Sequence, residues 1–288
     1  MSGGVLRRDY VAPVMDVGGR RFAWGTRTFL MGIVNVTPDS FSGDGLGPDV
    51  AAAVAQARRF EAEGADIIDV GGESSRPGAE PLPVEEEVRR VVPAVAAIRE
   101  AVGLPVSVDT YHAAVADEAL KAGAEMVNDI WGLRFDPAMA EVVARHGAAL
   151  VAMHNQRGRE FRDVAADIAA GFEASLELAK AAGIPLERVV LDPGFGFGWT
   201  PEQNVEMVRR LPELWRFNLP LLLGTSRKST LGLITGAAVE ERLLATASSM
   251  ALGVAGGADI VRVHDVQEMR QVVEVADAVV RDNWRSAP

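Results

Sequence analysis

The sequence predicts a single α/β domain folded as a (β/α)8 (TIM) barrel, and two regularities in its 288 residues point to that fold. Eight short apolar runs rich in Val, Ile and Leu recur along the chain, as buried parallel strands require. They lie at residues 28–36, 65–74, 104–110, 124–130, 148–155, 188–194, 219–228 and 258–265. Between them lie segments with apolar residues spaced by three and four, most of which end at Gly, as helices often do. Eight strands each followed by a helix favour a closed barrel over a doubly wound open sheet.

Residues 1–27 form an extension before the first predicted strand. Within it, the segment VMDVGGRRFAWG (14–25) is expected to form a β-hairpin that turns at Gly18 and Gly19 and closes the bottom of the barrel. No linker is visible in the sequence, so one domain is expected to span residues 1–288.

The composition narrows the possible classes of function. The formal net charge is −11, which weighs against a general nucleic-acid binder. The chain contains no Cys, which excludes disulfides, thiolate zinc sites and cysteine nucleophiles and favours a cytoplasmic location. The first residues form no long apolar run, and no stretch of about 18 apolar residues occurs, so neither a signal peptide nor a membrane span is expected.

Polar residues interrupt the apolar runs near their C-terminal ends, where a (β/α)8 barrel carries its active site. Asp69, Asp109, Asn128, His154 and Asp192 come from five separate runs and are expected to form part of one ring. A carboxylate can accept two parallel hydrogen bonds from the N–C–N edge of guanine or pterin, and an Asn amide can both donate and accept. The alternative is that such side chains cap turns or helix starts. Three of them, Asp109, Asn128 and Asp192, are the candidates for binding a flat heterocycle.

A second group of residues at the same end is basic. Lys228, Arg262 and His264 follow apolar runs, and Arg76 lies in the loop after the second strand. Basic groups gathered in so acidic a protein indicate a phosphate or diphosphate. Arg262 and His264 are two residues apart, so on a strand they point to the same side. The alternative for Arg262 is an ion pair with an acid at the top of the barrel.

Three loops carry unusual compositions. TPDSFSGDGLG (37–47) and GGESSRPGAE (71–80) are rich in Gly, Ser, Pro and Asp, as is typical of exposed loops that close over a reaction. DPGFGFGW (192–199) places two Phe among three Gly after the sixth strand. A phenyl ring there can stack on a flat substrate, although it can equally fill the core beneath the loop.

Seven segments in this order resemble the dihydropteroate synthase family over nearly the whole chain. They are MGIVNVTPDSFS, IIDVGGESSRPGA, SVDT, VNDI, DPGFGFG, TSRKS and IVRVHDV. The resemblance implies an enzyme that joins p-aminobenzoate to 6-hydroxymethyl-7,8-dihydropterin diphosphate and releases diphosphate. It also implies a Mg²⁺ cofactor and a dissociative displacement, in which the diphosphate leaves before the arylamine attacks.

The resemblance also assigns residues. The pterin would be bound by Asp109, Asn128, Met153, Asp192, Phe197 and Lys228. The diphosphate would be bound by Asn35, Arg262 and His264, with Asn35 near the Mg²⁺. The p-aminobenzoate would be bound by Ser75, Arg76, Pro77, Phe197 and Ser226. The catalytic residues would be Asp109, Asp192, Lys228, Arg262 and His264. A homodimer is expected from the family, and the small apolar face of ATASSMALGVAGG (245–257) would suit its interface.

Three positions depart from the commonest family pattern. Ser75 stands where Thr is usual, His112 where Lys is frequent, and Trp199 where Lys is common. The last two changes remove positive charge near the mouth of the barrel and are consistent with a degenerate paralogue that binds pterin without condensing it. A methyltetrahydrofolate–corrinoid methyltransferase is a second alternative, but SRK, RVHD and ESSRPG argue against it, because that class needs neither a diphosphate site nor a p-aminobenzoate site.

Overall fold

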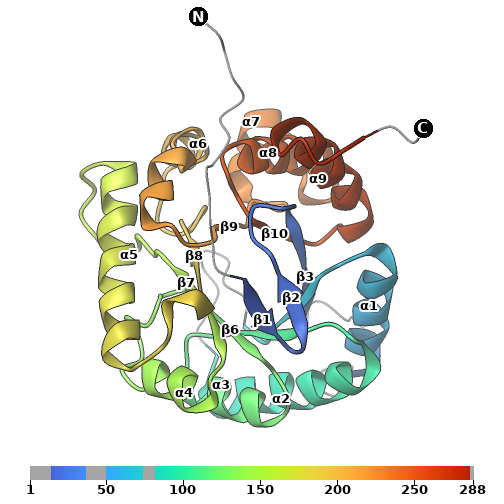
Figure 1. Ribbon diagram of the computed structural model, residues 1–288, viewed down its shortest axis with the longest axis vertical. Helices are drawn as coiled ribbons and strands as arrows, with labels where there is room; N and C mark the ends of the chain where they lie inside the picture. Colours follow the sequence, from blue (N-terminus) through green and yellow to red (C-terminus); the bar gives the residue numbers. More distant parts are fainter. Residues whose placement is uncertain (1–13, 37–49, 74–81, 286–288) are drawn as a thin grey trace, which may run out of the picture.

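The computed structural model describes residues 14–36, 50–73 and 82–285, and the predicted barrel is present within them (Figure 1). Its parallel strands run in the order β8-β7-β6-β5-β4-β3-β10-β9. They are β3 (Phe29–Asn35), β4 (Ile67–Gly71), β5 (Val106–Asp109), β6 (Met126–Asp129), β7 (Ala149–Met153), β8 (Val189–Asp192), β9 (Leu222–Leu223) and β10 (Ile260–Val263). A parallel bridge between Leu191 and Leu221 closes the barrel between β8 and β9.

The helices form a ring outside the strands (Figure 1). They are α1 (Val50–Glu63), α2 (Val84–Ala101), α3 (Ala113–Lys121), α4 (Met139–His146), α5 (Val164–Ala181), α6 (Pro201–Arg209), α7 (Ser229–Thr235), α8 (Leu243–Ala255) and α9 (Val266–Val280). The short α7 is additional to the eight predicted helical segments. Left-handed glycines lie within two residues of six helix ends: Gly64, Gly123, Gly147, Gly183, Gly236 and Gly257. All but Gly236 end helical segments that the sequence predicts. Among the described residues, no helix has the length and apolar character needed to cross a membrane.

The predicted hairpin is formed by β1 (Met15–Val17) and β2 (Arg20–Phe22). Gly18 and Gly19 have φ of 57° and 77°, which is the backbone that a two-residue hairpin turn requires. The aromatic rings of Phe22 and Trp24 pack on Phe29 and belong to the same buried cluster as the lower interior of the barrel. The hairpin therefore closes the bottom of the barrel, as predicted.

Side chains alternate along each strand between the inside of the barrel and the surrounding helices. The lower interior is an apolar cluster to which β3, β4, β6, β8 and β10 contribute Met31, Ile67, Met126, Val190 and Ile260. Residues two positions later on these strands must point into the same interior, one layer higher. This alternation determines which polar side chains reach the mouth, the opening at the C-terminal ends of the strands.

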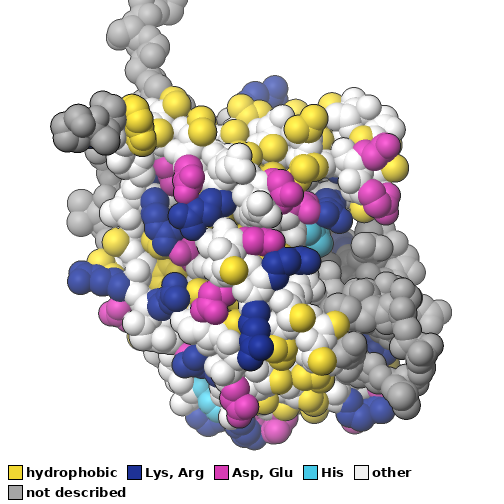
Figure 2. Space-filling model, turned by 90° about the vertical axis from the view of Figure 1, so that its right-hand side faces the viewer, with side chains coloured by type: hydrophobic (Ala, Val, Ile, Leu, Met, Phe, Trp, Pro, Cys, Tyr) yellow, Lys and Arg dark blue, Asp and Glu magenta, His cyan; other side chains and the backbone are white. Residues whose placement is uncertain are grey.

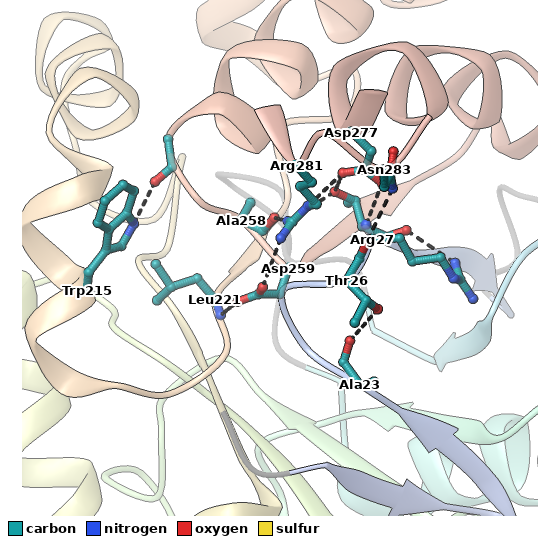
Figure 3. Close-up of polar contacts among 12 residues, drawn as sticks. Ala23, Thr26, Arg27, Trp215, Leu221, Ala258, Asp259, Asp277, Arg281 and Asn283 are labelled. Atoms are coloured by element: carbon teal, nitrogen blue, oxygen red, sulfur yellow. Dashed lines mark hydrogen bonds and ion pairs between the residues drawn. The ribbon is translucent and has the colours of Figure 1, made fainter. Parts of the chain in front are cut away.

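A polar network at the opposite end ties the C-terminal helix to the first barrel strand (Figure 3). Arg281, directly after α9, donates from Nε to Asp277 at 2.7 Å and from Nη2 to the carbonyl oxygen of Ala258 at 2.8 Å. Asp277 in turn accepts hydrogen bonds from the backbone N–H and the hydroxyl of Thr28. Asp259 accepts from the backbone N–H of Leu221. These buried polar groups stabilise the barrel bottom, far from the mouth.

Candidate functional site

Four of the predicted site residues point into the mouth because of the strand alternation. Asn128, Asp192 and Arg262 each lie two residues beyond an apolar residue of the interior cluster. Asp109 pairs in register with Asn128 across β5 and β6. Their side chains therefore gather on the inside of the barrel, although they come from four different strands.

Arg262 links two of the acids in the mouth. Its Nε donates to Oδ2 of Asp69 and its Nη2 donates to Oδ2 of Asp109, each at 2.6 Å. The ion pair considered as an alternative from the sequence is thus present, and it involves two acids. These two bonds use two of the five N–H groups of the guanidinium, so the ion pairs leave donors with which an anion can interact.

Lys228 follows β9 and lies beside the loop that follows β8. Its ammonium donates to the carbonyl oxygen of Phe195 and lies 4.6 Å from the centroid of the Phe197 ring. Asp192 accepts a hydrogen bond of 2.7 Å from the backbone N–H of Gly194, which fixes its carboxylate at the edge of the same loop. A cation, a carboxylate and an aromatic ring therefore meet at one place.

The loop can take this shape only because residue 194 is Gly. Gly194 has φ of +79°, and a Cβ atom there would lie 1.9 Å from the carbonyl oxygen of His154. We predict that Gly194→Ala lowers the free energy of unfolding by roughly 2–5 kcal/mol, from backbone strain and the steric clash together. Urea denaturation measures this loss.

Gly183→Ala is the matched control for that substitution. Gly183 has φ of +80°, but a Cβ atom there would have no heavy atom within 4 Å. Strain alone should cost about 1–2 kcal/mol at this position. Equal losses for the two variants would show that the contact with His154 does not restrict the loop.

An apolar wall completes the mouth. Ile130, Met153 and Phe197 form a buried cluster, against which Tyr111 and Trp131 pack. Met153 and Phe197 were both predicted to line the pterin pocket, and the structure brings them together. The other Phe of the loop, Phe195, belongs instead to the large core between strands and helices. One phenyl ring therefore lines the mouth and the other fills the core.

Ser226 and His264 are hydrogen-bonded at the end of β10. The Ser226 hydroxyl accepts from the backbone N–H of His264 at 3.2 Å and lies 2.9 Å from its Nδ1. Because the hydroxyl accepts from the backbone N–H, its own proton can be donated to Nδ1. The imidazole would then carry its proton on Nε2. This arrangement orients the ring of His264.

The remaining predicted residues divide into two groups. Asn35 ends β3 and pairs in register with Gly71 at the mouth, so an amide oxygen is present there as a ligand for a hard cation such as Mg²⁺. Ser75, Arg76 and Pro77, like most of the loops 37–47 and 71–80, lie outside the described residues. Glu73, Glu87 and His112 form the group of potential metal ligands found within the described residues. There, His112 Nδ1 is already 2.7 Å from the Glu87 carboxylate.

Burial moves the pKa values of three mouth residues toward neutrality. It raises the pKa of Asp109 to about 7, with Arg262 opposing the shift and Asp69 adding to it. It raises the pKa of Asp192 to about 6, against the opposing charge of Lys228. It lowers the pKa of Lys228 to about 8, against the opposing charge of Asp192. All three charges are therefore sensitive to pH in the physiological range.

Three residues singled out in the sequence lie elsewhere. His154 was expected in the polar ring, but it directly follows the inward-facing Met153 and packs outward against Gly171 of α5 and the ring of Trp199. Burial lowers the pKa of His154 to about 4, so its imidazole is neutral. Trp199 is buried rather than lining the mouth. His112 occupies the N-cap position of α3, and its side chain faces Glu87 rather than the helix N-terminus. Of the two departures from the family pattern, Trp199 is therefore engaged in packing and His112 in a hydrogen-bonded contact with Glu87.

Three further residues belong to the mouth although the sequence predicted no role for them. Asp69 was noted as part of the polar ring but received no role, and it bridges Asn128 and Arg262. Ile130 follows Asp129 at a strand end and joins the apolar wall. The guanidinium of Arg157 lies 4.9 Å from the Phe197 ring centroid. Of these three residues, only Asp69 could have been identified from the sequence, because it is an acid inside an apolar run.

Comparison with known proteins agrees with this geometry. A family model described as "Pterin binding enzyme" matches residues 31–264. The dihydropteroate synthase of Synechocystis is 44% identical over 285 residues, covering 96% of this chain and 97% of that protein. The crystal structure of dihydropteroate synthase from Clostridium difficile in the presence of pteroic acid is 46% identical, with a TM-score of 0.88, and covers 90% of this chain and 99% of that one. That of Xanthomonas albilineans with 4-aminobenzoic acid is 40% identical, with a TM-score of 0.88, and covers 93% and 98%.

Proposed function

The chain belongs to the dihydropteroate synthase family of pterin-binding enzymes, and we propose that it joins p-aminobenzoate to 6-hydroxymethyl-7,8-dihydropterin diphosphate, forming 7,8-dihydropteroate and diphosphate. One observation carries the proposal: carboxylates, an amide and two cations from separate strands converge on one mouth beside an apolar wall. That combination suits a flat heterocycle attached to an anion.

The pterin would lie between the apolar and the polar sides of the mouth. Met153 and Phe197 would contact the ring faces, while Asp109 and Asp192 would accept hydrogen bonds from ring N–H and amino groups. Asn128 would contribute an amide, and Lys228 would donate to a ring acceptor. The relative from Clostridium difficile, crystallised in the presence of pteroic acid, supports a pterin as the ligand.

The diphosphate would lie beside Arg262 and His264. These two residues would donate to its oxygens, and Asn35 would hold Mg²⁺ at the end of β3. When bound, Mg²⁺ would act as a Lewis acid that neutralises charge on those oxygens.

The p-aminobenzoate would be bound by Ser226 and Phe197 together with Ser75, Arg76 and Pro77 of the loop after β4. Its carboxylate would suit hydroxyl and guanidinium donors. The relative from Xanthomonas albilineans, crystallised with 4-aminobenzoic acid, supports this choice of second substrate.

The reaction would be a dissociative displacement. The bond between the pterin methylene carbon and the diphosphate oxygen breaks, and its electron pair leaves with the diphosphate. Arg262 and His264 stabilise the charge that develops on that oxygen. The methylene cation is delocalised into the pterin, where the carboxylates of Asp109 and Asp192 stabilise it. The arylamine lone pair then forms the new C–N bond, and the amine proton passes to water. An unprotonated arylamine needs no strong base to attack the cation.

Dihydropteroate formation by the purified protein tests this function. Both substrates are supplied with Mg²⁺, and dihydropteroate and diphosphate should appear in equal amounts. If neither product forms over a wide range of Mg²⁺ concentrations although the pterin still binds, the degenerate paralogue would be favoured. Loss of the methyl group from methyltetrahydrofolate would favour the methyltransferase.

The shifted pKa values predict a bell-shaped pH dependence. Asp109 and Asp192 must be ionised to accept hydrogen bonds, so kcat/KM for the pterin diphosphate should rise as pH passes about 6 and about 7. Lys228 must be protonated, so the same quantity should fall above about pH 8. Initial rates at low pterin concentration measure the profile. In Lys228→Arg the falling limb should move to higher pH, because a guanidinium stays charged; a falling limb that stays in place would exclude Lys228 as its cause.

We further propose that the enzyme is a cytoplasmic homodimer that pairs through α7, α8 and α9. Figure 2 shows apolar side chains gathered at the top of the view, the end occupied by these helices in Figure 1. The exposed apolar side chains of α7, α8 and α9 include Leu233, Leu244, Leu252, Val275 and Val279, which are 63–78% exposed. An exposed apolar face of this kind suits a second copy of the chain. Sedimentation equilibrium should give twice the chain mass of 30.6 kDa, and Leu244→Arg should reduce it; a wild-type mass of one chain would contradict the dimer.

A further inference from the structure

Asp69 is the most deeply placed polar residue of the mouth. It lies in the middle of β4, with no exposed surface, two residues below Gly71, which pairs in register with both Asn35 and Asp109. Its Oδ2 accepts two hydrogen bonds, one of 3.0 Å from Nδ2 of Asn128 and one of 2.6 Å from Nε of Arg262. One carboxylate oxygen thus contacts a residue assigned to the pterin and a residue assigned to the diphosphate.

The contact with Asp69 sets which way the Asn128 amide faces. An ionised carboxylate can only accept hydrogen bonds, so the NH₂ group of Asn128 must turn toward Asp69. The amide oxygen of Asn128 is then turned away from Asp69, as an acceptor available to a ring N–H group. Without Asp69, both orientations of the amide would be open, and one of them would present donors to the pterin instead.

The same oxygen also sets the plane of the Arg262 guanidinium. With Nε bonded to Asp69 and Nη2 bonded to Asp109, the flat group is held at two points. Two carboxylates also balance a buried cation that one carboxylate would balance less well. The remaining N–H donors are then held in a fixed direction.

We propose that Asp69 is a positioning residue, which orients Asn128 toward the pterin and Arg262 toward the diphosphate without touching either substrate. The inference rests on the proposed function, because that function supplies the two ligand groups. It assigns one buried side chain to the binding of both halves of one substrate. It predicts that loss of Asp69 impairs the pterin diphosphate far more than p-aminobenzoate.

Asp69→Asn is the test, because it keeps the shape of the side chain and removes its charge. The variant should lower kcat/KM for the pterin diphosphate by about 10- to 100-fold, as loss of a group that orients a binding residue does. Its KM for p-aminobenzoate should stay within about twofold of the wild-type value, since Asp69 does not orient that site. Thermal unfolding establishes that the variant is folded; if it is not, Asp69→Ser, with a smaller uncharged acceptor, replaces it.

The pH profile separates positioning from a merely structural role. Asp109 is faced by Arg262 of β10, Asp69 of β4, Glu87 of α2 and Lys228, and the charge of Asp69 raises the pKa of Asp109. Removing that charge should move the acid limb of kcat/KM to lower pH. An acid limb that stays in place, or an equal loss for both substrates, would overturn the inference.

Asp66→Asn is the matched control, three residues earlier in the chain. Asp66 is also buried and also pairs with an arginine, Arg27, but it lies at the bottom of the barrel and accepts from the backbone N–H of Leu30. Its substitution should lower stability and leave kcat/KM and the pH profile unchanged. Binding of pteroic acid, measured by calorimetry for wild type and both variants, keeps the test independent of turnover. If the wild-type protein binds pteroic acid but forms no dihydropteroate, the proposed function fails. The positioning role is still supported in that case if Asp69→Asn binds pteroic acid more weakly than wild type and Asp66→Asn does not.

Discussion

Replacing Arg262 with Ala is expected to lower kcat/KM for the pterin diphosphate by about 10³-fold or more, since loss of one donor to a developing oxyanion commonly costs 10²–10³. The guanidinium is also the ion-pair partner of Asp69 and Asp109, at 2.6 Å each. Its loss therefore leaves two carboxylates in the mouth without their ion-pair partner. Steady-state rates with each substrate varied in turn measure the effect.

The same substitution should destabilise the fold. Removing one partner of a buried ion pair typically costs about 3–5 kcal/mol, because an uncompensated charge remains. Arg281→Ala is the matched control, since Arg281 pairs with Asp277 at the barrel bottom. Both variants should lose stability, but only Arg262→Ala should lose activity when both are assayed well below their unfolding temperatures. Unchanged turnover in Arg262→Ala would exclude Arg262 from the diphosphate site.

Replacing Asp192 with Asn is expected to separate activity from stability. Activity with the pterin diphosphate should fall by about 10²-fold or more, because an amide of the same shape replaces a charged acceptor. The fold, however, should become more stable at high pH. Asp192 is only 6% exposed, so burial of its charge works against the folded state, while the amide oxygen can still accept from the backbone N–H of Gly194.

The Asn variant gains stability at high pH because the pKa of Asp192 is raised, to about 6 in the folded protein against about 3.9 in an unfolded chain. The stabilisation from this group is present below pH 4 and is lost as pH rises through about 6. At about pH 8.5 the Asn variant should therefore be more stable than wild type by on the order of 1–3 kcal/mol, a few degrees in Tm. Below about pH 4 the difference should be small, because this carboxyl group is then protonated in the folded protein and largely protonated in the unfolded chain.

Asp163→Asn provides a control of opposite sign. Hydrogen bonding to Arg210 holds the pKa of Asp163 below its usual value, and Asp163 accepts from the backbone N–H of Ala166 at the start of α5. Its ionised form therefore stabilises the fold above its unfolded pKa. Calorimetry at about pH 8.5 should show a lower Tm for this variant and a higher Tm for Asp192→Asn. A lower Tm for both would mean that burial of the Asp192 charge is not the dominant effect.

The barrel and much of the mouth can be predicted from the sequence because two periodicities determine them. Apolar runs near the interior residues Met126, Val190 and Ile260 identify buried strands, and the period of two then places Asn128, Asp192 and Arg262 on the inside of the barrel. The same rule, applied one residue further, places His154 on the outside, directly after the inward-facing Met153. His154 was expected in the mouth because it lies near a strand end. A residue there reaches the mouth only if its side chain also points to the inside of the barrel.

Partners between distant strands could not be predicted in the same way. Arg262 and Asp69 are 193 residues apart in the sequence, and only the closed order of the strands brings them into contact. Nor does a local pattern show that Trp199 turns into the core or that His112 faces Glu87 of α2. Their contacts depend on how the helices pack against the barrel. Tertiary packing, rather than local sequence, therefore decides which polar residues near a strand end form the site.

A crystal structure of this protein with bound pteroic acid tests the central claim most directly. The proposal predicts that the pterin ring contacts Met153 and Phe197, with ring N–H groups within hydrogen-bonding distance of the amide oxygen of Asn128 and of a carboxylate from Asp109 or Asp192. A pterin bound outside the mouth, or inside it but beyond reach of these three residues, would contradict the account.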